Sequence, residues 1–430
     1  MKIVVIHQYF LRPEEGGASR FNEMTSRWAE AGHEVTVIAG QAHYASGEKA
    51  PEYRRKLMVE EWYGAVRVLR TYTPSTFHAS IPGRMWAFAG FATAATAVVL
   101  TAIRDADVVV ATSPSLLVLV PGLAAKVVRR WPLVFEVRDL WPESAVATGV
   151  LGANSPITRG LYRLEALGYR LADRINVLTP AFRENILDRR LANDDDIVFI
   201  PNGADLDLVR PGPVDVELRE RLGWGDKFVM LYAGAHGIAN HLWQYIDAAE
   251  ALRDDENILL ASVGDGPQRE DLIAETERRG LKNLQWLDAV PKSEMVALLR
   301  SADAGAAVLK RTDTFKTVYP NKIFDYMSCE LPVLCVIDGV ARQLVEAARA
   351  GVFAEPENPQ ALARAIRSLA KLPPAERKLM GRRGRTYVAK NFDRTALADS
   401  YLQVLSELVE GEAPQGPLTE TADEPAKVSG

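Results

Sequence analysis

The sequence has few of the residues that build disulfide frameworks or zinc clusters. Its 430 residues include only two cysteines, Cys329 and Cys335, and six histidines. Two cysteines are too few for a disulfide framework in a chain of this length, so we expect a reducing, cytoplasmic setting. No Cys or His group has the spacing of metal ligands, and we expect no metal cofactor. The net charge of −5 is unlike that of a strongly basic nucleic-acid-binding protein.

Long hydrophobic runs are also scarce. The run from Ile3 to Ile6 ends at His7 and predicts a short buried strand rather than a signal peptide. The longest uncharged stretch is Met85 to Ile103, close to the ~20 residues that span a bilayer. Its Ala, Thr and Gly content favours a buried helix. A helix at the membrane surface and a true span are open alternatives.

Short apolar runs alternate with helical stretches along most of the chain. Strands are predicted at 3–6, 34–39, 66–70, 108–111, 134–137, 174–178, 198–200, 228–233, 258–263, 284–287, 306–309 and 332–336. Helices are predicted between them, among others at 18–31, 116–130, 242–252 and 268–279. Strands rich in Val and Ile that alternate with helices predict an α/β fold with parallel sheets buried on both faces.

The length suits two domains. Pro211-Gly212-Pro213 separates the two series of strands, so we expect a first domain over 1–207 and a second over 208–392. An amphipathic helix is predicted over 393–410, packing back on the first domain. Residues 411–430 have several Pro, Glu, Thr and Gly and few large apolar groups, which predicts a disordered tail.

Two segments of the first half carry residues suited to a sugar or a phosphate. Gly16 and Gly17 precede a predicted helix, where a backbone without side chains and a helix N-terminus favour an anion. The alternative is a plain turn. Arg138, Asp139, Trp141 and Glu143 follow a predicted strand, and ligands bind at such strand ends in open α/β sheets. Carboxylates beside a Trp ring suit a sugar, and a surface loop is the alternative.

Two turns of the second half also follow predicted strands. Gly234 and His236 follow the first strand of the second domain, and Gly264 and Gly266 follow the next one. Glycines here let a phosphate or sugar approach the backbone. Arg269, just beyond, is suited to neutralise a diphosphate. The alternatives are an ordinary polar loop for His236 and a tight turn with a solvated arginine.

A fifth segment, residues 317–327, predicts a helix that starts near Pro320. Lys322 lies in its first turn, where both its ammonium and the helix attract phosphate. Asp325 lies three residues later on the same face, where its carboxylate suits ribose hydroxyls. A surface salt bridge between the two is the alternative. The Asp-x-Asp strings at 105–107 and 205–207 are weak candidates for a metal site.

These five segments, in this order, resemble the family 4 glycosyltransferases with the GT-B fold. The resemblance covers about residues 1–409 and is most specific at Gly264-Asp265-Gly266-Pro267 and at Pro320–Met327. The string Asp139–Ser144 is similar to the fucosamine transferase (WbuB-like) subgroup of surface-polysaccharide assembly. Two motifs depart from the family: Thr317 stands where a Glu is common, and Ala235 and Asn240-His241 stand where a basic pair is common.

The resemblance implies two Rossmann-like domains facing each other across a cleft, the first binding the acceptor and the second the nucleotide. It implies sugar transfer with retention of configuration and without an essential metal. Gly16 and Gly17 are then expected to face the donor phosphates, Lys322 to contact the diphosphate and Asp325 the ribose. Asn202 and Gly203 are expected in the linker between the domains.

We therefore predict a glycosyltransferase of hexosyl or N-acetylhexosaminyl type with a UDP-sugar donor. The acceptor is a saccharide or a polyprenyl-linked saccharide, with peripheral contact at the inner face of the membrane. The expected binding residues are Gly16, Gly17, Gly234, Gly264, Gly266, Arg269, Lys322 and Asp325 for the donor, and Arg138, Asp139, Trp141 and Glu143 for the acceptor. Asp139, Lys322 and His236 are the catalytic candidates. A sugar-nucleotide epimerase and a non-catalytic partner protein of the same fold are the alternatives.

Overall fold

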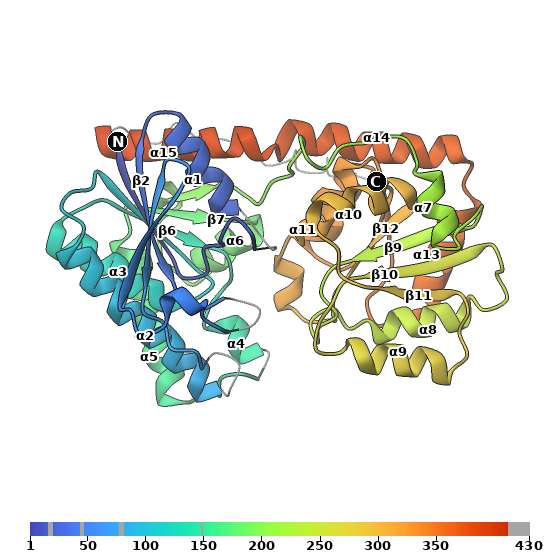
Figure 1. The fold of residues 1–430 in the computed structure, drawn as a ribbon, viewed down its shortest axis with the longest axis horizontal. Coiled ribbons are helices and arrows are strands. Elements are labelled where there is room, and N and C mark those ends of the chain that lie inside the picture. The colour runs from blue at the N-terminus through green and yellow to red at the C-terminus, as the bar shows by residue number, and fades with distance from the viewer. Residues whose placement is uncertain (16–19, 44–46, 77–80, 148, 412–430) are drawn as a thin grey trace. The chain divides into compact units, whose positions relative to one another are not determined.

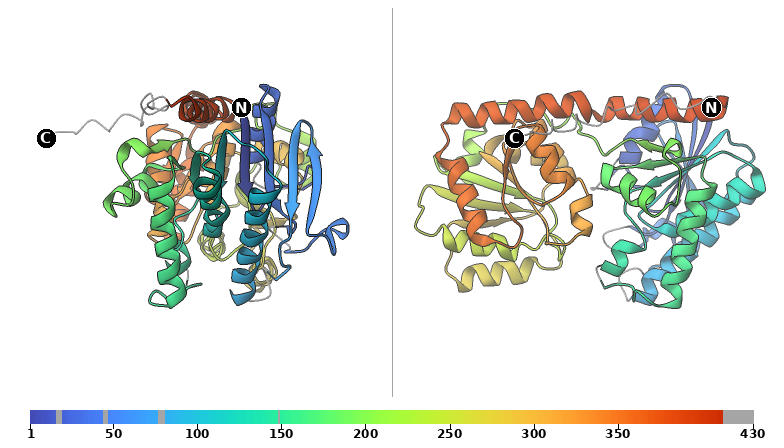
Figure 2. Two further views of the ribbon diagram at one scale, coloured as in Figure 1. Left: turned by 90° about the vertical axis from the view of Figure 1, so that its left-hand side faces the viewer. Right: turned by 180° about the vertical axis from the view of Figure 1, so that it is seen from behind.

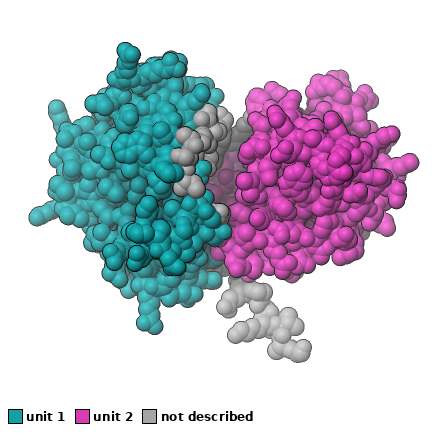
Figure 3. Space-filling view, turned by 90° about the horizontal axis from the view of Figure 1, so that it is seen from below, with its two compact units in different colours: residues 1–201, 395–426 teal, residues 202–394, 427–430 magenta. Residues whose placement is uncertain are grey.

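The computed structural model describes residues 1–15, 20–43, 47–76, 81–147 and 149–411. It consists of two compact units, which Figure 3 shows in different colours. Unit 1 holds Met1–Pro201 together with the chain from Thr395, and unit 2 holds Asn202–Arg394. The chain thus enters unit 2 a few residues before the predicted joint at 207. Of the tail predicted over 411–430, residues 412–430 lie outside the described residues.

Unit 1 contains an eight-stranded sheet with the order β3-β4-β2-β1-β5-β6-β7-β8. All neighbouring strands are parallel except β3 and β4, which form an antiparallel edge. The strands are β1 (Lys2–His7), β2 (Glu34–Gly40), β3 (Met58–Tyr63), β4 (Val66–Thr71), β5 (Val108–Thr112), β6 (Leu133–Val137), β7 (Arg174–Val177) and β8 (Ile197–Phe199). Val and Ile fill the central strands because both faces of the sheet are covered.

The helices of unit 1 cover the two faces of its sheet, as Figures 1 and 2 show. They are α1 (Arg20–Glu30), α2 (Ile81–Thr101), α3 (Leu119–Ala124), α4 (Glu143–Ala147), α5 (Pro156–Leu171), α6 (Pro180–Asp188) and α15 (Arg394–Glu410). The connection from β1 to β2 runs one way along the sheet, and those from β4 to β7 run the other way. Right-handed crossovers therefore place α1 on one face and α2, α3 and α5 on the other.

The predicted C-terminal helix is α15, and it packs in the core of unit 1. Tyr401 is fully buried against Trp28 and Phe21 of α1. Trp28 Nε1 donates a hydrogen bond of 3.0 Å to the carbonyl oxygen of Ala398. The chain that leaves unit 2 therefore completes the first unit, as the fold prediction required.

The uncharged stretch from Met85 belongs to α2. This helix is long and apolar enough to cross a membrane, with 39% of its most apolar window buried. Ala87, Phe91, Ala95 and Val99 are buried, and α2 packs against β2, β4 and α3. The structure therefore uses one side of α2 as a core helix, and its opposite side is solvent-exposed.

The single helix predicted over 116–130 is divided into three parts. A 3-10 turn at Leu116–Val118 leads into α3, and a π-helical turn follows at Ala125–Arg129. Pro121 lies in the first turn of α3, where proline is tolerated because its missing N–H would have no partner within the helix. The segment ends at Arg130 in the left-handed conformation, with φ 62°.

Unit 2 contains a six-stranded parallel sheet with the order β11-β10-β9-β12-β13-β14. Its strands are β9 (Phe228–Ala233), β10 (Ile258–Val263), β11 (Leu284–Leu287), β12 (Ala304–Val308), β13 (Val333–Val336) and β14 (Gly351–Phe353). Its helices are α7 (Val216–Arg221), α8 (Trp243–Ala251), α9 (Arg269–Arg278), α10 (Lys292–Ser301), α11 (Asn321–Ser328), α12 (Val340–Ala347), α13 (Pro359–Lys371) and α14 (Pro374–Asn391). Two apolar cores cover the two faces of this sheet, so both units are α/β with the predicted parallel sheets.

Candidate active site

In unit 2, the two predicted glycine turns lie side by side at the carboxyl ends of neighbouring strands. Ala233 pairs with Val263 at the ends of β9 and β10. The backbone N–H of Gly234 donates a hydrogen bond of 3.0 Å to the carbonyl oxygen of Val263. Gly264 has φ +148°, and a Cβ there would lie 2.0 Å from the carbonyl oxygen of Gly234. Only glycine fits this approach, so Gly264 keeps the two turns in contact.

A matched pair of substitutions tests this packing. We expect Gly264→Ala to destabilise unit 2 by clearly more than Gly280→Ala, because Gly280 also has positive φ but no atom within 4 Å of its Cβ position. The Gly280 change then reports only the backbone cost of about 1–2 kcal/mol. Denaturant unfolding monitors both variants, and equal losses would contradict the close-packed turn.

Lys322 comes from the second residue of α11 and reaches the first of these turns. Its Nζ lies 3.8 Å from the ring centre of Tyr232, and a Cβ on Gly234 would lie 2.9 Å from Nζ. Nζ is buried and has no hydrogen-bond partner. Burial lowers the pKa of Lys322 to about 7. A buried amino group without a hydrogen-bond partner therefore lies at the end of β9, where an anion would favour its charged form.

His236 lies beneath the turns rather than at their surface. The residue is fully buried, and its Nε2 is 2.9 Å from Ser262 Oγ. The backbone N–H of His236 donates to the carbonyl oxygen of Asp265, and the backbone carbonyl oxygen of His236 accepts from the N–H of Gln268. Burial, followed by Arg269, lowers the pKa of His236 to about 4, so the ring is neutral. This placement ties the two glycine turns together, and the catalytic role expected for His236 stays a prediction.

The other donor candidates of unit 2 also lie on this edge of the sheet. Gly266 packs against His236, since a Cβ there would lie 2.6 Å from the carbonyl oxygen of His236. Arg269 opens α9 and pairs with Asp288 through a 2.6 Å contact, a partner that the sequence did not indicate. Asp325 follows Lys322 by three residues on α11 and is partly buried. Gly16 and Gly17 lie outside the described residues.

In unit 1, the acceptor candidates follow β6, and each contacts a different partner. Asp139 Oδ2 accepts a 2.9 Å hydrogen bond from Ser144 Oγ, and burial raises the pKa of Asp139. Trp141 packs edge-on against Phe88 of α2. Glu143 Oε2 accepts a hydrogen bond from Asn185 on α6. Arg138 points elsewhere, toward the end of β1.

Arg138 contacts a residue that the sequence analysis did not single out. Its Nη1 lies 2.9 Å from His7 Nε2, at the carboxyl end of β1. Burial, and then the charge of Arg138, lowers the pKa of His7 well below its usual value, so the ring is neutral. If Nε2 accepts from Arg138, Nδ1 carries the proton, and this buried atom has no partner. The position of His7 directly after a predicted strand was the feature of the sequence that could have identified it as a site residue.

A buried ion pair supports this edge from below. Arg20 Nε, at the start of α1, lies 3.3 Å from Glu136 Oε1 on β6, and both side chains are nearly inaccessible. Asn176 of β7 donates to the other carboxylate oxygen over 3.1 Å. Arg20 also donates to the carbonyl oxygens of Ile200 and Pro201. The sequence analysis missed this network. It joins the start of α1 to β6, to β7 and to Ile200 and Pro201, where the chain leaves unit 1 for unit 2.

Each unit also has a cavity. In unit 1, a cavity of about 360 Å³ lies at the carboxyl ends of β1 and β2 and is lined by Phe10, Arg12, Gln41, Tyr53 and Arg70, among others. Its volume is at the small end of the range of about 300–1,000 Å³ for ligand pockets. The carbonyl oxygen of the Gln41 side chain is buried without a hydrogen-bond partner.

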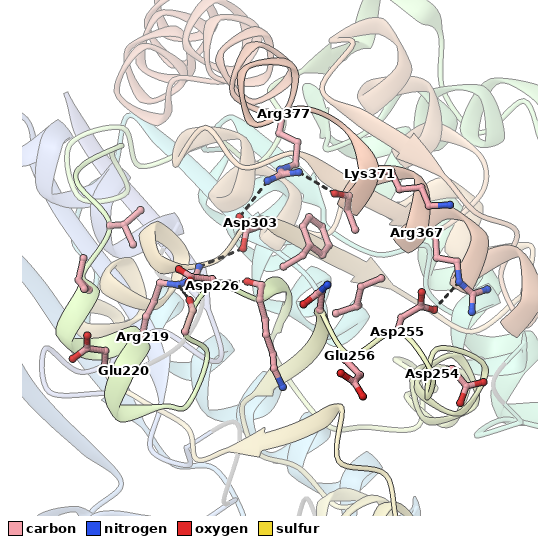
Figure 4. Close-up of a pocket in the computed structure, with 18 residues that line it drawn as sticks. Arg219, Glu220, Asp226, Asp254, Asp255, Glu256, Asp303, Arg367, Lys371 and Arg377 are labelled. Atoms are coloured by element: carbon pink, nitrogen blue, oxygen red, sulfur yellow. Dashed lines mark hydrogen bonds and ion pairs between the residues drawn. The ribbon is translucent and has the colours of Figure 1, made fainter.

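The larger cavity of unit 2, about 940 Å³, lies at the opposite edge of that sheet, where β9 and β10 begin. Figure 4 shows Asp303 between Arg219 and Arg377, and Arg367 beside Asp255. All five of these side chains are engaged in ion pairs. Open α/β sheets bind ligands at the carboxyl ends of their strands, so the glycine turns, and not the larger cavity, are the candidate ligand site of unit 2. Within the described residues, no three His, Cys, Asp or Glu side chains are grouped as metal ligands.

Two glycosyltransferase family models match the chain, one on each side of the division between the units. The model described as glycosyl transferase 4-like domain matches residues 15–203. The model described as glycosyl transferases group 1 matches residues 215–387, which include Gly234, Gly264 and Lys322. Most of the chain is therefore similar to known glycosyltransferase domains.

Individual proteins show the same relationship. The chain is 27% identical over 399 residues to the Escherichia coli protein named colanic acid biosynthesis glycosyl transferase WcaI, covering 87% of this chain and 93% of that protein. It is 27% identical over 278 residues to Pseudomonas aeruginosa glycosyltransferase WbjE, covering 63% and 67%. The solved structure of Anabaena HepE in complex with UDP has a TM-score of 0.71 at 18% identity, covering 95% of this chain and all of that one. The chain belongs to the glycosyltransferases of the GT-B fold, with a 4-like first domain and a group 1 second domain.

Proposed function

We propose that the protein transfers a hexosyl or N-acetylhexosaminyl group from a UDP-sugar to a saccharide or polyprenyl-linked saccharide in polysaccharide biosynthesis, with retention of configuration. The observation that carries the proposal is the buried, unpartnered Lys322 ammonium beside Gly234. A diphosphate supplies the missing counter-charge. The structures of HepE with UDP and with UDP-glucose support the choice of base, and the name of WcaI supports the polysaccharide. The fucosamine transferase subgroup remains a proposal on Asp139–Ser144.

In this proposal the residues of unit 2 stabilise the leaving diphosphate. Lys322 and the N–H groups of the turns after β9 and β10 face the charge that develops as the glycosidic bond breaks. Arg269 contributes positive charge, although its guanidinium also pairs with Asp288. Asp325 holds the ribose hydroxyls. The expected phosphate contacts of Gly16 and Gly17 stay a prediction, because both residues lie outside the described part of the chain. No metal ion takes part in this scheme.

The residues of unit 1 hold the acceptor. Asp139 orients the acceptor hydroxyl or stabilises positive charge on the sugar, with Trp141 and Glu143 nearby in sequence. Ser144 Oγ donates a hydrogen bond to one oxygen of Asp139, which fixes the carboxylate in place and suits an orienting group. We add His7 to this set, because its Nδ1–H is a buried donor without a partner next to Arg138. The hydroxyl attacks from the face that the diphosphate leaves.

A thermal-shift screen against UDP, GDP, ADP and their sugar conjugates tests the donor assignment. We expect selective stabilisation by UDP, about 2.7 kcal/mol at 100 times the dissociation constant. The shift should disappear in Lys322→Met and persist in Lys371→Met, since Lys371 is an exposed lysine elsewhere in unit 2. An equal shift in both variants would remove Lys322 from the site. Conversion of the UDP-sugar without any acceptor would indicate an epimerase instead.

A further inference from the structure

Strand β3 forms an unusually long sheet edge for this protein. Among the described strands, the sheets end at β3, β8, β11 and β14. The last three have three, four and three residues, whereas β3 has six. Proteins commonly protect a sheet edge by keeping its strand short or by placing Pro, Lys or a bulge in it. β3 contains neither Pro nor Lys, and its register with β4 is continuous, so it has none of these protections.

The backbone groups of alternate β3 residues point away from the sheet. The N–H of Tyr72 donates a hydrogen bond of 2.8 Å to the carbonyl oxygen of Leu57. These two residues stand opposite each other in the continued register of the β3–β4 ladder. Hydrogen-bonded pairs alternate in an antiparallel ladder, so Leu57 and every second residue after it bond to β4. The N–H and C=O groups of Met58, Glu60 and Trp62 therefore point outward.

The side chains of these three outward residues form a pattern that is symmetric about Glu60. Met58 and Trp62 are 41% and 61% exposed and lie on the same face of the strand. Glu60 lies between them and already has a cationic partner, because Arg67 of β4 donates to its two carboxylate oxygens over 3.0 and 3.1 Å. The edge therefore presents free backbone groups with a large apolar side chain on either side of a paired charge.

We propose that two copies of the chain pair antiparallel along β3, about a twofold axis at Glu60. In this register Met58 of one copy faces Trp62 of the second copy. Leu57, which is 79% exposed, faces Tyr63 of the second copy. Cross-strand pairs of an aromatic ring with an aliphatic or thioether group stabilise a sheet. The dimer joins the sheets of the two copies of unit 1 into one, and the proposal does not depend on sugar transfer.

A second copy suits this edge better than a strand of different sequence. Because Met58 and Trp62 lie two positions on either side of Glu60, self-pairing covers all four of these apolar side chains at once. The two Glu60 carboxylates meet at the axis, where like charges directly opposite each other are unfavourable. Each of them keeps the Arg67 of its own copy, so the row of four charges is neutral. Twofold dimers are also the commonest soluble oligomers.

Sedimentation velocity of the full chain tests the proposal. We expect a species of twice the chain mass of 47.4 kDa that dissociates on dilution. Glu60→Pro should weaken dimerisation roughly tenfold or more, because it removes both hydrogen bonds that the Glu60 N–H groups donate at the axis. Proline is tolerated where the N–H of an edge strand points outward, so the β3–β4 ladder should persist. Met58→Lys with Trp62→Lys should also yield monomers, whereas Leu379→Lys, at an exposed leucine of α14, should leave the dimer unchanged.

Cysteine cross-linking tests the register. Cys329 and Cys335 are buried, so the unaltered chain should form no linked dimer when copper phenanthroline is added as oxidant. Glu60→Cys should form one, because opposed residues of a ladder have Cα atoms about 5.5 Å apart, within reach of a disulfide. Met58→Cys alone should not, because the two copies of residue 58 lie four positions apart, about 14 Å. Met58→Cys combined with Trp62→Cys should cross-link again.

Three results would each overturn the proposal. The first is an unaltered protein that stays monomeric up to high micromolar concentration, which would leave the edge to a strand of another protein. The second is a dimer that both Glu60→Pro and the double lysine variant retain, which would place the interface elsewhere. The third is efficient cross-linking by Met58→Cys alone. Circular dichroism confirms that each variant is folded.

Discussion

Replacing Lys322 by Met is expected to stabilise the free protein and at the same time to weaken donor binding. The ammonium is buried over Tyr232 without a partner, so the folded state loses free energy by keeping it there. Each unit by which the pKa of Lys322 falls corresponds to about 1.4 kcal/mol. Methionine removes this cost but also removes a charge-assisted contact of about 1.5–3 kcal/mol, so UDP-sugar turnover should fall tenfold or more.

The pH dependence of stability gives a second readout of the same residue. The pKa of Lys322 is lowered from 10.5 to about 7 by burial, so between these values the unfolded chain holds a proton that the folded chain lacks. Its contribution to stability therefore rises with pH across this window. Urea unfolding at several pH values should show that Lys322→Met lacks this slope. The slope should persist in Lys371→Met, and a slope shared by all three proteins would arise from another group.

Replacing Arg20 by Met is expected to cause the largest loss of stability. Glu136 is fully buried, and removal of its cationic partner leaves an uncompensated charge, which typically costs about 3–5 kcal/mol. The hydrogen bonds to Ile200 and Pro201 are lost as well. These contacts join α1 to the point where the chain leaves unit 1. Denaturant unfolding followed by tryptophan fluorescence should therefore show the loss of stability.

Arg27 offers a control on the same helix. Its 2.6 Å pair with Asp399 is exposed, with 40% and 56% of the two side chains accessible. Exposed pairs contribute about 0–1 kcal/mol, so Arg27→Met should change stability little. In a Glu136→Gln background, Arg20→Met should cost less than it does alone, because no buried charge remains. Additive losses in this double-mutant cycle would mean that the two side chains are not coupled.

The sequence predicted strands best where strand length and composition agreed. The predictions for β9, β10 and β11 have the observed bounds, because apolar runs there end at Gly or Asp. It missed β3, whose residues Met58–Tyr63 include Glu60 and Glu61 and alternate in exposure at the sheet edge. It placed β12 two residues late, because Ala304-Gly305 lacks the β-branched residues that mark a strand.

The candidate site could be predicted in part for a topological reason. Parallel strands end at one edge, so residues that follow β9 and β10 come together from sequence alone. The contact of Lys322 with Gly234 and Tyr232 could not be predicted, because it depends on the three-dimensional position of α11. The pairing of Arg269 with Asp288 and of Arg20 with Glu136 joins residues far apart in the chain, and the sequence contains no local sign of either.

The return of the C-terminal helix to unit 1 has a consequence for how the protein is made. Unit 2 is continuous from Asn202 to Arg394, whereas unit 1 is interrupted and needs the segment that starts at Thr395. Trp28 and Phe21 have no cover until Tyr401 and Leu405 arrive. During synthesis, which runs from the N-terminus, the first domain to emerge therefore waits with an open apolar face while the second is translated and folds. The domain that begins the chain is the last to be finished.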